Sequence, residues 1–187
     1  MRKIFRDIKE CKKCSLCKKR NLPTIYCGNL KSKILFIGEA PGKNEDEEGK
    51  CFVGKAGNDI LWRELDKYEL LRTDFHVTNC CKCFPSKSKT PNKKQIEICY
   101  GWLVKEIKAI NPCLILAFGN TSVRSLTGRD GGITDLSGKT EWSEKLKCWI
   151  CWSIHPSSVL HNPLNKKYFE DGIKNFSEKI TLLGDLK

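Results

Sequence analysis

Three polar residues stand directly after apolar runs of the sequence, and their types suit bond-breaking chemistry. Glu39 follows ILFIG, Asn79 follows FHVT, and His155 follows WICWSI. A carboxylate can orient water, an amide can donate and accept hydrogen bonds at once, and an imidazole can hold or donate a proton. Each residue alone has an ordinary structural explanation, in a loop, a turn or a packed ring. Their joint position after three apolar runs favours one shared site.

Four apolar runs and the helical patterns between them predict how these residues are placed. The runs at 34–37, 75–78, 114–118 and 149–154 are apolar on consecutive positions, which is typical of strands covered on both faces. Alternation with helices predicts a parallel sheet with helices on both faces. The carboxyl ends of such strands share one edge, where ligands bind, so the three polar residues are expected to converge there.

The clearest helical pattern covers 90–111, with Thr90 as the expected cap and Pro91 in the first turn. Further helices are expected after Gly57, at 120–126 and at 165–183. The segment 127–147 is polar and contains glycine, which indicates a loop or an irregular hairpin. With 187 residues and no internal repeat, the chain is expected to form a single domain over 1–187.

Composition points to a soluble protein with an anionic partner. Lys and Arg outnumber Asp and Glu by 34 to 22, a net charge of +12, which favours nucleic acid. A lysine-rich, heat-adapted proteome explains the same surplus without a partner. The apolar runs are too short to span a bilayer, and no secretion signal is visible at the first residues. We therefore expect a cytoplasmic, nucleoid-associated protein.

Twelve cysteines in a chain without a secretion signal favour metal ligation over disulfides. CKKC at 11–14 overlaps CSLC at 14–17, and a second CxxC lies at 148–151. A zinc site that joins the two motifs is disfavoured, because Cys148 and Cys151 on a strand point to opposite faces. Cys27, Cys51 and Cys113 are interpreted as small buried or partly buried hydrophobic residues.

Four motifs in this chain resemble those of the family 4 uracil-DNA glycosylases. They are GEAPG at 38–42, FVG at 52–54, TN at 78–79 followed by Lys82 and Cys83, and HPSSVL at 155–160. Their order and spacing match the family over residues 11–162. The resemblance implies a three-layer α/β/α fold. It also implies a monofunctional enzyme that flips deoxyuridine out of DNA and hydrolyses the N-glycosidic bond to free uracil and an abasic site.

The resemblance assigns roles to the residues of the predicted site. Phe52 stacks on the flipped base, Asn79 reads its edge, and the Glu45 side chain excludes the thymine methyl group. His155 stabilises the departing uracil anion. The best-known uracil glycosylases carry an aspartate where this chain has Ala40, so Glu39 is expected to orient the water. The implied uracil-binding set is Gly38, Ala40, Glu45, Phe52, Asn79 and His155, and the implied DNA contacts are Ser157 and Ser158 to phosphates and Leu160 as a wedge.

The family also carries a structural [4Fe–4S] cluster, whose four cysteines correspond here to Cys11, Cys14, Cys83 and Cys99. Cys17 could replace Cys11 within the overlapping motif. Expected partners are uracil-containing DNA, single- or double-stranded, with a replication clamp as a further candidate, and a monomer is expected. The alternatives are a glycosylase for hypoxanthine or other deaminated bases, a non-catalytic metal-stabilised nucleic-acid-binding module, and an electron carrier.

Overall fold

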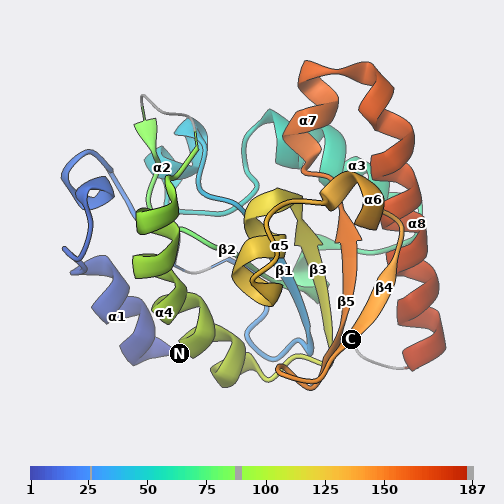
Figure 1. Cartoon of the computed structure of the whole chain (residues 1–187), viewed down its shortest axis with the longest axis horizontal. Coiled ribbons are helices and arrows are strands. Elements are labelled where there is room, and N and C mark those ends of the chain that lie inside the picture. The colour runs from blue at the N-terminus through green and yellow to red at the C-terminus, as the bar shows by residue number, and fades with distance from the viewer. Residues whose placement is uncertain (26, 87–89, 185–187) are drawn as a thin grey trace.

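A five-stranded sheet forms the centre of the protein in the computed structural model, which describes residues 1–25, 27–86 and 90–184 (Figure 1). The strand order is β2-β1-β3-β5-β4. Four strands are parallel, and β4 pairs with β5 in the antiparallel sense at one edge. The strands are β1 (Ile34–Gly38), β2 (His76–Asn79), β3 (Leu114–Phe118), β4 (Thr140–Ser143) and β5 (Cys148–Ser153).

All four predicted strands are confirmed, with ends shifted by a residue at most. The sequence interpretation of 127–147 as a loop or irregular hairpin is right only for its second half, where β4 and β5 form the hairpin. A short helix, α6 (Ile133–Leu136), occupies the first half. The strand β4 was missed because its residues TEWS are at most partly buried and carry no apolar run.

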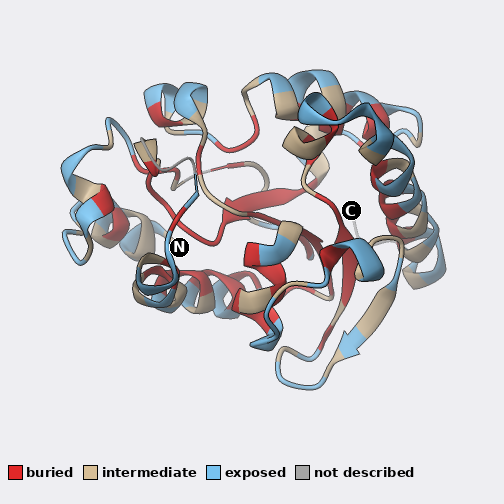
Figure 2. Cartoon of the chain, turned by 45° about the horizontal axis from the view of Figure 1, so that its top comes forward, coloured by how far each residue is buried: buried red, intermediate tan, exposed pale blue. Residues whose placement is uncertain are grey.

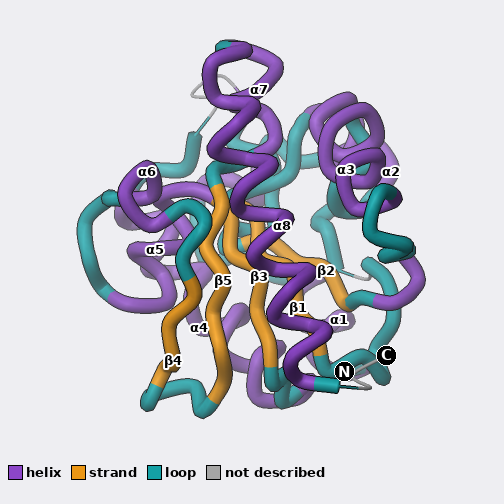
Figure 3. The backbone as a smooth tube through the Cα atoms, turned by 90° about the vertical axis from the view of Figure 1, so that its right-hand side faces the viewer, coloured by secondary structure: helices purple, strands orange, loops and turns teal. Residues whose placement is uncertain are grey.

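Helices cover both faces of the sheet, and this gives the three-layer α/β/α arrangement that was predicted. Helix α5 packs on β1 and β3, while α8 packs on β5. Figure 3 shows α8 in front of the strands and α4 behind them. The longer helices are α1 (Arg2–Lys9), α4 (Lys93–Ile110), α5 (Gly119–Thr127) and α8 (Lys166–Leu183). The shorter ones are η1 (Ser15–Lys18), α2 (Lys43–Glu48), η2 (Ala56–Trp62), α3 (Arg63–Asp66), η3 (Arg72–Asp74), α7 (Pro156–His161) and η5 (Pro163–Asn165).

The start of α4 differs from the sequence prediction. Asn92, not Thr90, caps the helix, and its side chain accepts from the backbone N–H of Gln95 at 2.9 Å. The Gln95 side chain accepts from the Asn92 backbone N–H in return. This reciprocal pair satisfies two backbone donors that a Thr90 cap leaves free, so Pro91 lies before the helix.

The central strands are buried because both of their faces are covered. Every residue of β1 and β3 is buried, and Figure 2 shows this buried region running through the middle of the molecule. Aromatic rings tie the layers together: Phe36 on β1 stacks on Phe75 with centroids 4.5 Å apart and meets the edge of Phe176 on α8. Each such aromatic pair stabilises the fold by about 0.5–1.5 kcal/mol beyond the contribution of the buried surface area.

A second, smaller hydrophobic cluster joins the N-terminal segment to α4. It contains Ile8, Leu16, Cys81, Cys83, Ile96, Cys99 and Trp102. Helices α1 and α4 are in contact, so the first CxxC motif lies next to the cysteine of α4. Within the described residues, no helix is long and apolar enough to cross a membrane.

Candidate active site and cysteine pocket

A cavity of about 630 Å³ opens at the carboxyl ends of the parallel strands. This is the end of the sheet toward which the arrowheads of β3 and β5 point in Figure 1, and it carries α7. Most of the predicted site residues line it, although they come from distant segments of the chain. They are Glu39, Ala40, Glu45, Phe52, Asn79, His155, Ser157 and Leu160.

Two predicted residues stand outside the cavity wall. Gly38 lies directly behind it, because a Cβ atom there would be 2.3 Å from Asn79 Oδ1 and 2.8 Å from Phe52 Cζ. Only glycine therefore lets the amide and the ring approach each other. The hydroxyl of Ser158 donates to the main-chain oxygen of His155 at 2.7 Å, so its contact with DNA stays a prediction.

Phe52 is held in a left-handed backbone conformation with φ of 52°. Its ring stacks on His155, with centroids 5.8 Å apart and planes at 26°. Its carbonyl oxygen accepts from the Trp62 indole N–H at 2.9 Å and from the Arg72 guanidinium at 3.0 Å. A Cβ atom at Gly57 would be 2.0 Å from the same oxygen. These contacts fix the ring that forms one wall of the cavity.

The sequence reasoning missed Trp62 and Arg72. Trp62 belongs to η2, a π-helical segment, and Arg72 lies 20 residues beyond Phe52. The guanidinium of Arg72 also donates to the carbonyl oxygen of Cys51 and lies over the Trp62 ring. No local pattern in the sequence indicates that a distant arginine binds these two carbonyl groups.

Asn79 is the last residue of β2 and is only 2% exposed. It lies opposite Gly38 in the register of β1 and β2, and this places its amide at the inner end of the cavity. The main-chain oxygen of Asn79 accepts from the Lys82 ammonium group at 2.7 Å. The side-chain amide is thus carried by a backbone that is itself fixed.

Lys82 belongs to a buried polar network behind Asn79 that the sequence did not reveal. Lys82 and Glu106 are each 1% exposed and form an ion pair. The Lys82 ammonium also donates to the Thr78 hydroxyl at 2.6 Å, and that hydroxyl donates to Glu106 at 2.7 Å. Burial lowers the pKa of Lys82, but the charge and hydrogen bond of Glu106, together with nearby cysteines, outweigh this effect, and the net pKa is raised. The amine is therefore protonated and cannot act as a nucleophile.

His155 is placed at the N-cap of α7 by the following Pro156. Its Nδ1 accepts from the Ser157 backbone N–H at 3.2 Å and lies 2.7 Å from the Ser157 hydroxyl. Burial lowers the pKa of His155 to about 4, so the ring is neutral at physiological pH. Since Nδ1 is the acceptor, the proton lies on Nε2.

Glu39 is oriented by a residue from another helix. Its carboxylate accepts from the Thr121 hydroxyl at 2.6 Å, and Thr121 belongs to α5. The main-chain oxygen of Glu39 accepts from the Cys81 N–H at 2.9 Å. The carboxylate therefore has a fixed position beside Ala40 in the cavity wall. The only sequence signal for Thr121 is its place just after β3, at the same edge of the sheet.

Glu45 has a structural contact as well as its place in the cavity wall. Its carboxylate accepts from the Gly42 backbone N–H. Burial raises the pKa of this carboxyl group, and the N–H groups of Gly42, Phe52 and Val53 partly offset that effect. Glu45 thus connects the GEAPG loop to the FVG loop.

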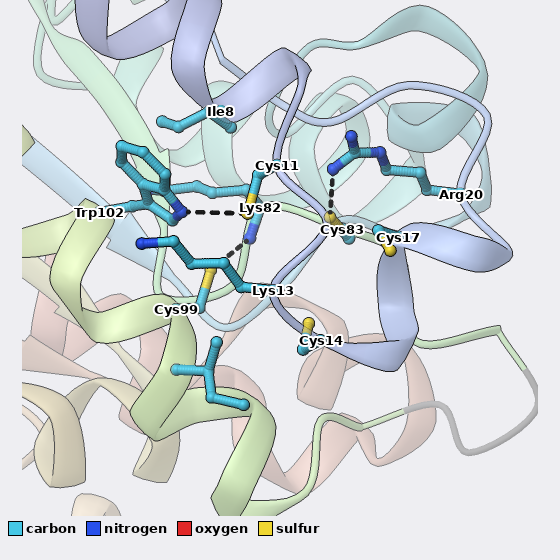
Figure 4. Close-up of a pocket in the computed structure, with 11 residues that line it drawn as sticks. Ile8, Cys11, Lys13, Cys14, Cys17, Arg20, Lys82, Cys83, Cys99 and Trp102 are labelled. Atoms are coloured by element: carbon cyan, nitrogen blue, oxygen red, sulfur yellow. Dashed lines mark hydrogen bonds between the residues drawn. The ribbon is translucent and has the colours of Figure 1, made fainter.

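Five cysteines line a second pocket, which is shown in Figure 4. They are the four predicted ligands Cys11, Cys14, Cys83 and Cys99, together with Cys17. Three have donors: Trp102 Nε1 is 3.3 Å from Cys11 Sγ, Arg20 is 3.0 Å from Cys83 Sγ, and the Lys82 N–H is 3.4 Å from Cys99 Sγ. Burial raises the pKa of Cys99, but a hydrogen bond from the Cys81 thiol has a larger, opposite effect and lowers this pKa to about 7.

The donor set of this pocket fits a cluster with several metal atoms. Among the described residues, no three His, Cys, Asp or Glu side chains are arranged to hold a single metal ion. Four thiolates are the usual ligands of an iron–sulfur cluster, and five cysteines line this pocket. Cys148 and Cys151 belong to the main core and do not line this pocket.

Comparison with known proteins agrees with this geometry. Residues 25–177 match the model of the uracil DNA glycosylase superfamily. The chain is 34% identical to the type-4 uracil-DNA glycosylase of Archaeoglobus fulgidus, over 94% of this chain and 90% of the relative. It is 32% identical to the type-4 uracil-DNA glycosylase of Pyrobaculum aerophilum, over 94% and 92%. The type-5 uracil-DNA glycosylase of the latter organism is 26% identical, over 71% and 64%. This chain therefore belongs to the uracil DNA glycosylase superfamily.

Proposed function

We propose that this protein is a monofunctional uracil-DNA glycosylase that acts in DNA repair. It hydrolyses the N-glycosidic bond of deoxyuridine and leaves free uracil and an abasic site. The observation that carries the proposal is the single cavity that gathers Glu39, Phe52, Asn79 and His155. Identities of 34% and 32% to two type-4 enzymes, each over 94% of this chain, support the proposal.

Base recognition is assigned to Asn79. Its amide accepts from uracil N3–H and donates to O4 while the base stacks on Phe52. Cytosine reverses both hydrogen-bonding groups, so its binding leaves two buried groups unpaired and is strongly disfavoured. Thymine differs by one methyl group, and the Glu45 side of the cavity excludes that group by shape.

Departure of uracil is assisted by His155. With its proton on Nε2, the neutral ring donates a hydrogen bond to uracil O2, where negative charge develops as the bond breaks. One well-placed donor of this kind lowers the barrier by about 3–4 kcal/mol. The hydrogen bond from Ser157 to Nδ1 keeps the ring in this tautomer.

Water attack is assigned to Glu39. Its carboxylate, fixed by the Thr121 hydroxyl, orients water toward the sugar carbon and stabilises the positive charge that develops there. Ala40 beside it has no group that could share this task. The buried ammonium of Lys82 is bound to Glu106 and is given no part in the attack, so we expect hydrolysis by water without a cut in the DNA strand.

DNA contacts are assigned to the mouth of the cavity. Leu160 is 45% exposed there and fills the space that the flipped base leaves in the duplex. Ser157 and Ser158 bind the flanking phosphates. Lys43 and Lys55 also line the cavity and add positive charge near the DNA backbone.

The cysteine pocket is proposed to hold a structural [4Fe–4S] cluster on Cys11, Cys14, Cys83 and Cys99. Four thiolates suit an iron–sulfur cluster, and each iron takes one of them. Cys11 is preferred over Cys17 because Trp102 donates to its sulfur. The four residues tie the N-terminal segment to α4 and to the loop after β2.

The decisive experiment incubates the protein with an oligonucleotide that contains one uracil and then heats it in alkali. Cleavage at the uracil position only after alkali supports a monofunctional glycosylase. Intact DNA, with protein that retains its iron, contradicts the proposal and favours a non-catalytic binding module. A Glu39→Gln variant should retain DNA binding and lose most of the activity. Hypoxanthine-containing DNA should remain intact.

A further inference from the structure

Two cysteines outside the cysteine pocket lie in direct contact with each other, beside Phe52. Cys27 and Cys51 are 3% and 1% exposed, and their sulfur atoms are 2.7 Å apart although they are separated by 24 positions in the sequence. The sequence interpretation of each as a small buried hydrophobic residue is therefore incomplete. The contact pairs two groups that can form a covalent bond.

The backbone on both sides of the pair is fixed by other contacts. The carbonyl oxygen of Cys27 accepts from the Val77 N–H on β2 at 2.7 Å, and Gly28 is so close to Phe75 that a Cβ would lie 2.2 Å from its oxygen. The carbonyl oxygen of Cys51 accepts from Arg72 at 2.6 Å. Because the two backbones are held independently, the approach of the sulfur atoms is a property of the fold.

The surroundings give the two sulfurs different roles. The two sulfur atoms are hydrogen-bonded to each other, and Cys27 Sγ also accepts from the backbone N–H of Cys51 at 2.8 Å. The thiol of Cys51 lowers the pKa of Cys27 more than burial raises it, whereas burial raises the pKa of Cys51. Cys27 is thus the thiolate-forming member and Cys51 the proton-bearing partner.

We propose that Cys27 and Cys51 form a disulfide when the protein meets a hydroperoxide. The Cys27 thiolate attacks hydrogen peroxide and breaks its O–O bond; with one proton this gives Cys27 sulfenic acid and water. The Cys51 thiol then attacks the sulfenic sulfur, the S–O bond breaks, and a second water leaves. The two thiols supply the two electrons that the peroxide takes up.

The disulfide closes a covalent ring that contains β1, Glu39 and α2. The ring is closed by Cys27 and Cys51. Cys27 precedes Gly28, which pairs with His76 on β2, and Cys51 precedes Phe52, whose backbone is left-handed. The bond therefore restrains the loop that carries the aromatic wall of the cavity. This inference does not depend on the proposed activity, because it concerns thiol chemistry alone.

Mass spectrometry of the metal-loaded wild-type protein tests the proposal. The protein is treated with increasing hydrogen peroxide, alkylated in denaturant and digested without reductant. The test is read at the dose that oxidises half of Cys113, a partly exposed thiol that reports on the oxidant. We expect a peptide pair linked through Cys27 and Cys51, about 2 Da lighter than the sum of the reduced peptides. Separately alkylated Cys27 and Cys51 at that dose overturn the proposal.

Variants separate the link from general oxidation. Cys27→Ser should lose the linked peptide, while the matched control Cys113→Ser should retain it. Peroxide should raise the thermal midpoint of the control by several degrees relative to its reduced form, because the bond restricts the unfolded chain. It should not raise that of Cys27→Ser. If Cys27→Ser shifts as the control does, the stabilisation does not come from this pair and the proposal fails.

Discussion

At the scale of single residues, the cavity depends on groups with fixed polarity. His155 donates from Nε2 because Ser157 uses its other nitrogen, and Asn79 presents an amide whose backbone is bound by Lys82. Both side chains are arranged before the base arrives, so little is lost in ordering them at the moment of reaction. The same fixed arrangement makes their replacement costly.

Replacement of Asn79 by alanine should abolish most of the activity. The variant loses two hydrogen bonds to the uracil edge, and we expect kcat/KM on uracil-containing DNA to fall by roughly a hundredfold or more. Asn44→Ala is the matched control, because Asn44 lines the same cavity and is assigned no contact with the base edge. Steady-state kinetics on a labelled oligonucleotide measures both. Equal losses in the two variants would contradict the role of Asn79 in reading the base.

At the scale of elements, the segment after β2 connects the cavity to the cysteine pocket. Lys82 donates to the backbone of Asn79 in one direction, while its own N–H donates to Cys99 in the other. Cys83, the next residue, lines the cysteine pocket. Helix α4 contributes both Glu106 and Cys99, so one helix supports the two sites.

Breaking the Lys82–Glu106 pair should separate stability from activity. Lys82→Met alone leaves the charge of buried Glu106 without a cation to compensate it, and we expect a loss of about 3–5 kcal/mol of unfolding free energy. Adding Glu106→Leu should restore much of that stability, since no uncompensated charge remains. The double variant should still have low kcat, because the Asn79 carbonyl has lost its donor. Urea unfolding and single-turnover kinetics test this. Full recovery of kcat in the double variant would show that the pair is only structural.

Removal of one proposed ligand should release the N-terminal segment. Cys99→Ala is expected to lose iron and to become sensitive to proteolysis within residues 1–20, because α1 and η1 are joined to α4 mainly through the smaller cluster. Cys17→Ala, which alters the spare cysteine of the pocket, should retain its iron. Iron analysis with limited proteolysis measures both. Loss of iron from Cys17→Ala and not from Cys11→Ala would show that Cys17, and not Cys11, is the ligand.

At the scale of the whole molecule, the buried His76 and the half-buried His155 make stability depend on acidity. Burial lowers the pKa of His76 and of His155 to about 4 each, from 6.5. Between pH 4 and 6.5 these histidines bind protons in the unfolded chain but not in the folded chain. Their contribution to the free energy of unfolding is therefore fully present above pH 6.5 and is lost as the pH falls toward 4. A fully buried ring such as His76 contributes on the order of 2–3 kcal/mol.

Urea unfolding between pH 7 and 4.5 should show this loss, with less loss in His76→Leu. The matched control is His161→Asn at an exposed position, which should unfold as the wild type does. Stability that does not change over this range would contradict the burial of both rings as neutral groups.

Much of the cavity was predictable from sequence because parallel strands bring their carboxyl ends together. Glu39, Asn79 and His155 each follow an apolar run, and this was enough to place them at one edge. Arg72 and Thr121 were not predictable, because their contacts depend on how helices pack and not on local pattern. Strand β4 was missed for a related reason: only its pairing with β5 makes it a strand.

The left-handed backbone of Phe52 limits how this enzyme could be redesigned for another base. Any side chain there must accept a φ of 52°, where β-branched residues are strained by roughly 1–2 kcal/mol. Its carbonyl oxygen must also stay within reach of Trp62 and Arg72. A new base preference is therefore easier to introduce at the opposite rim of the cavity than at the ring itself.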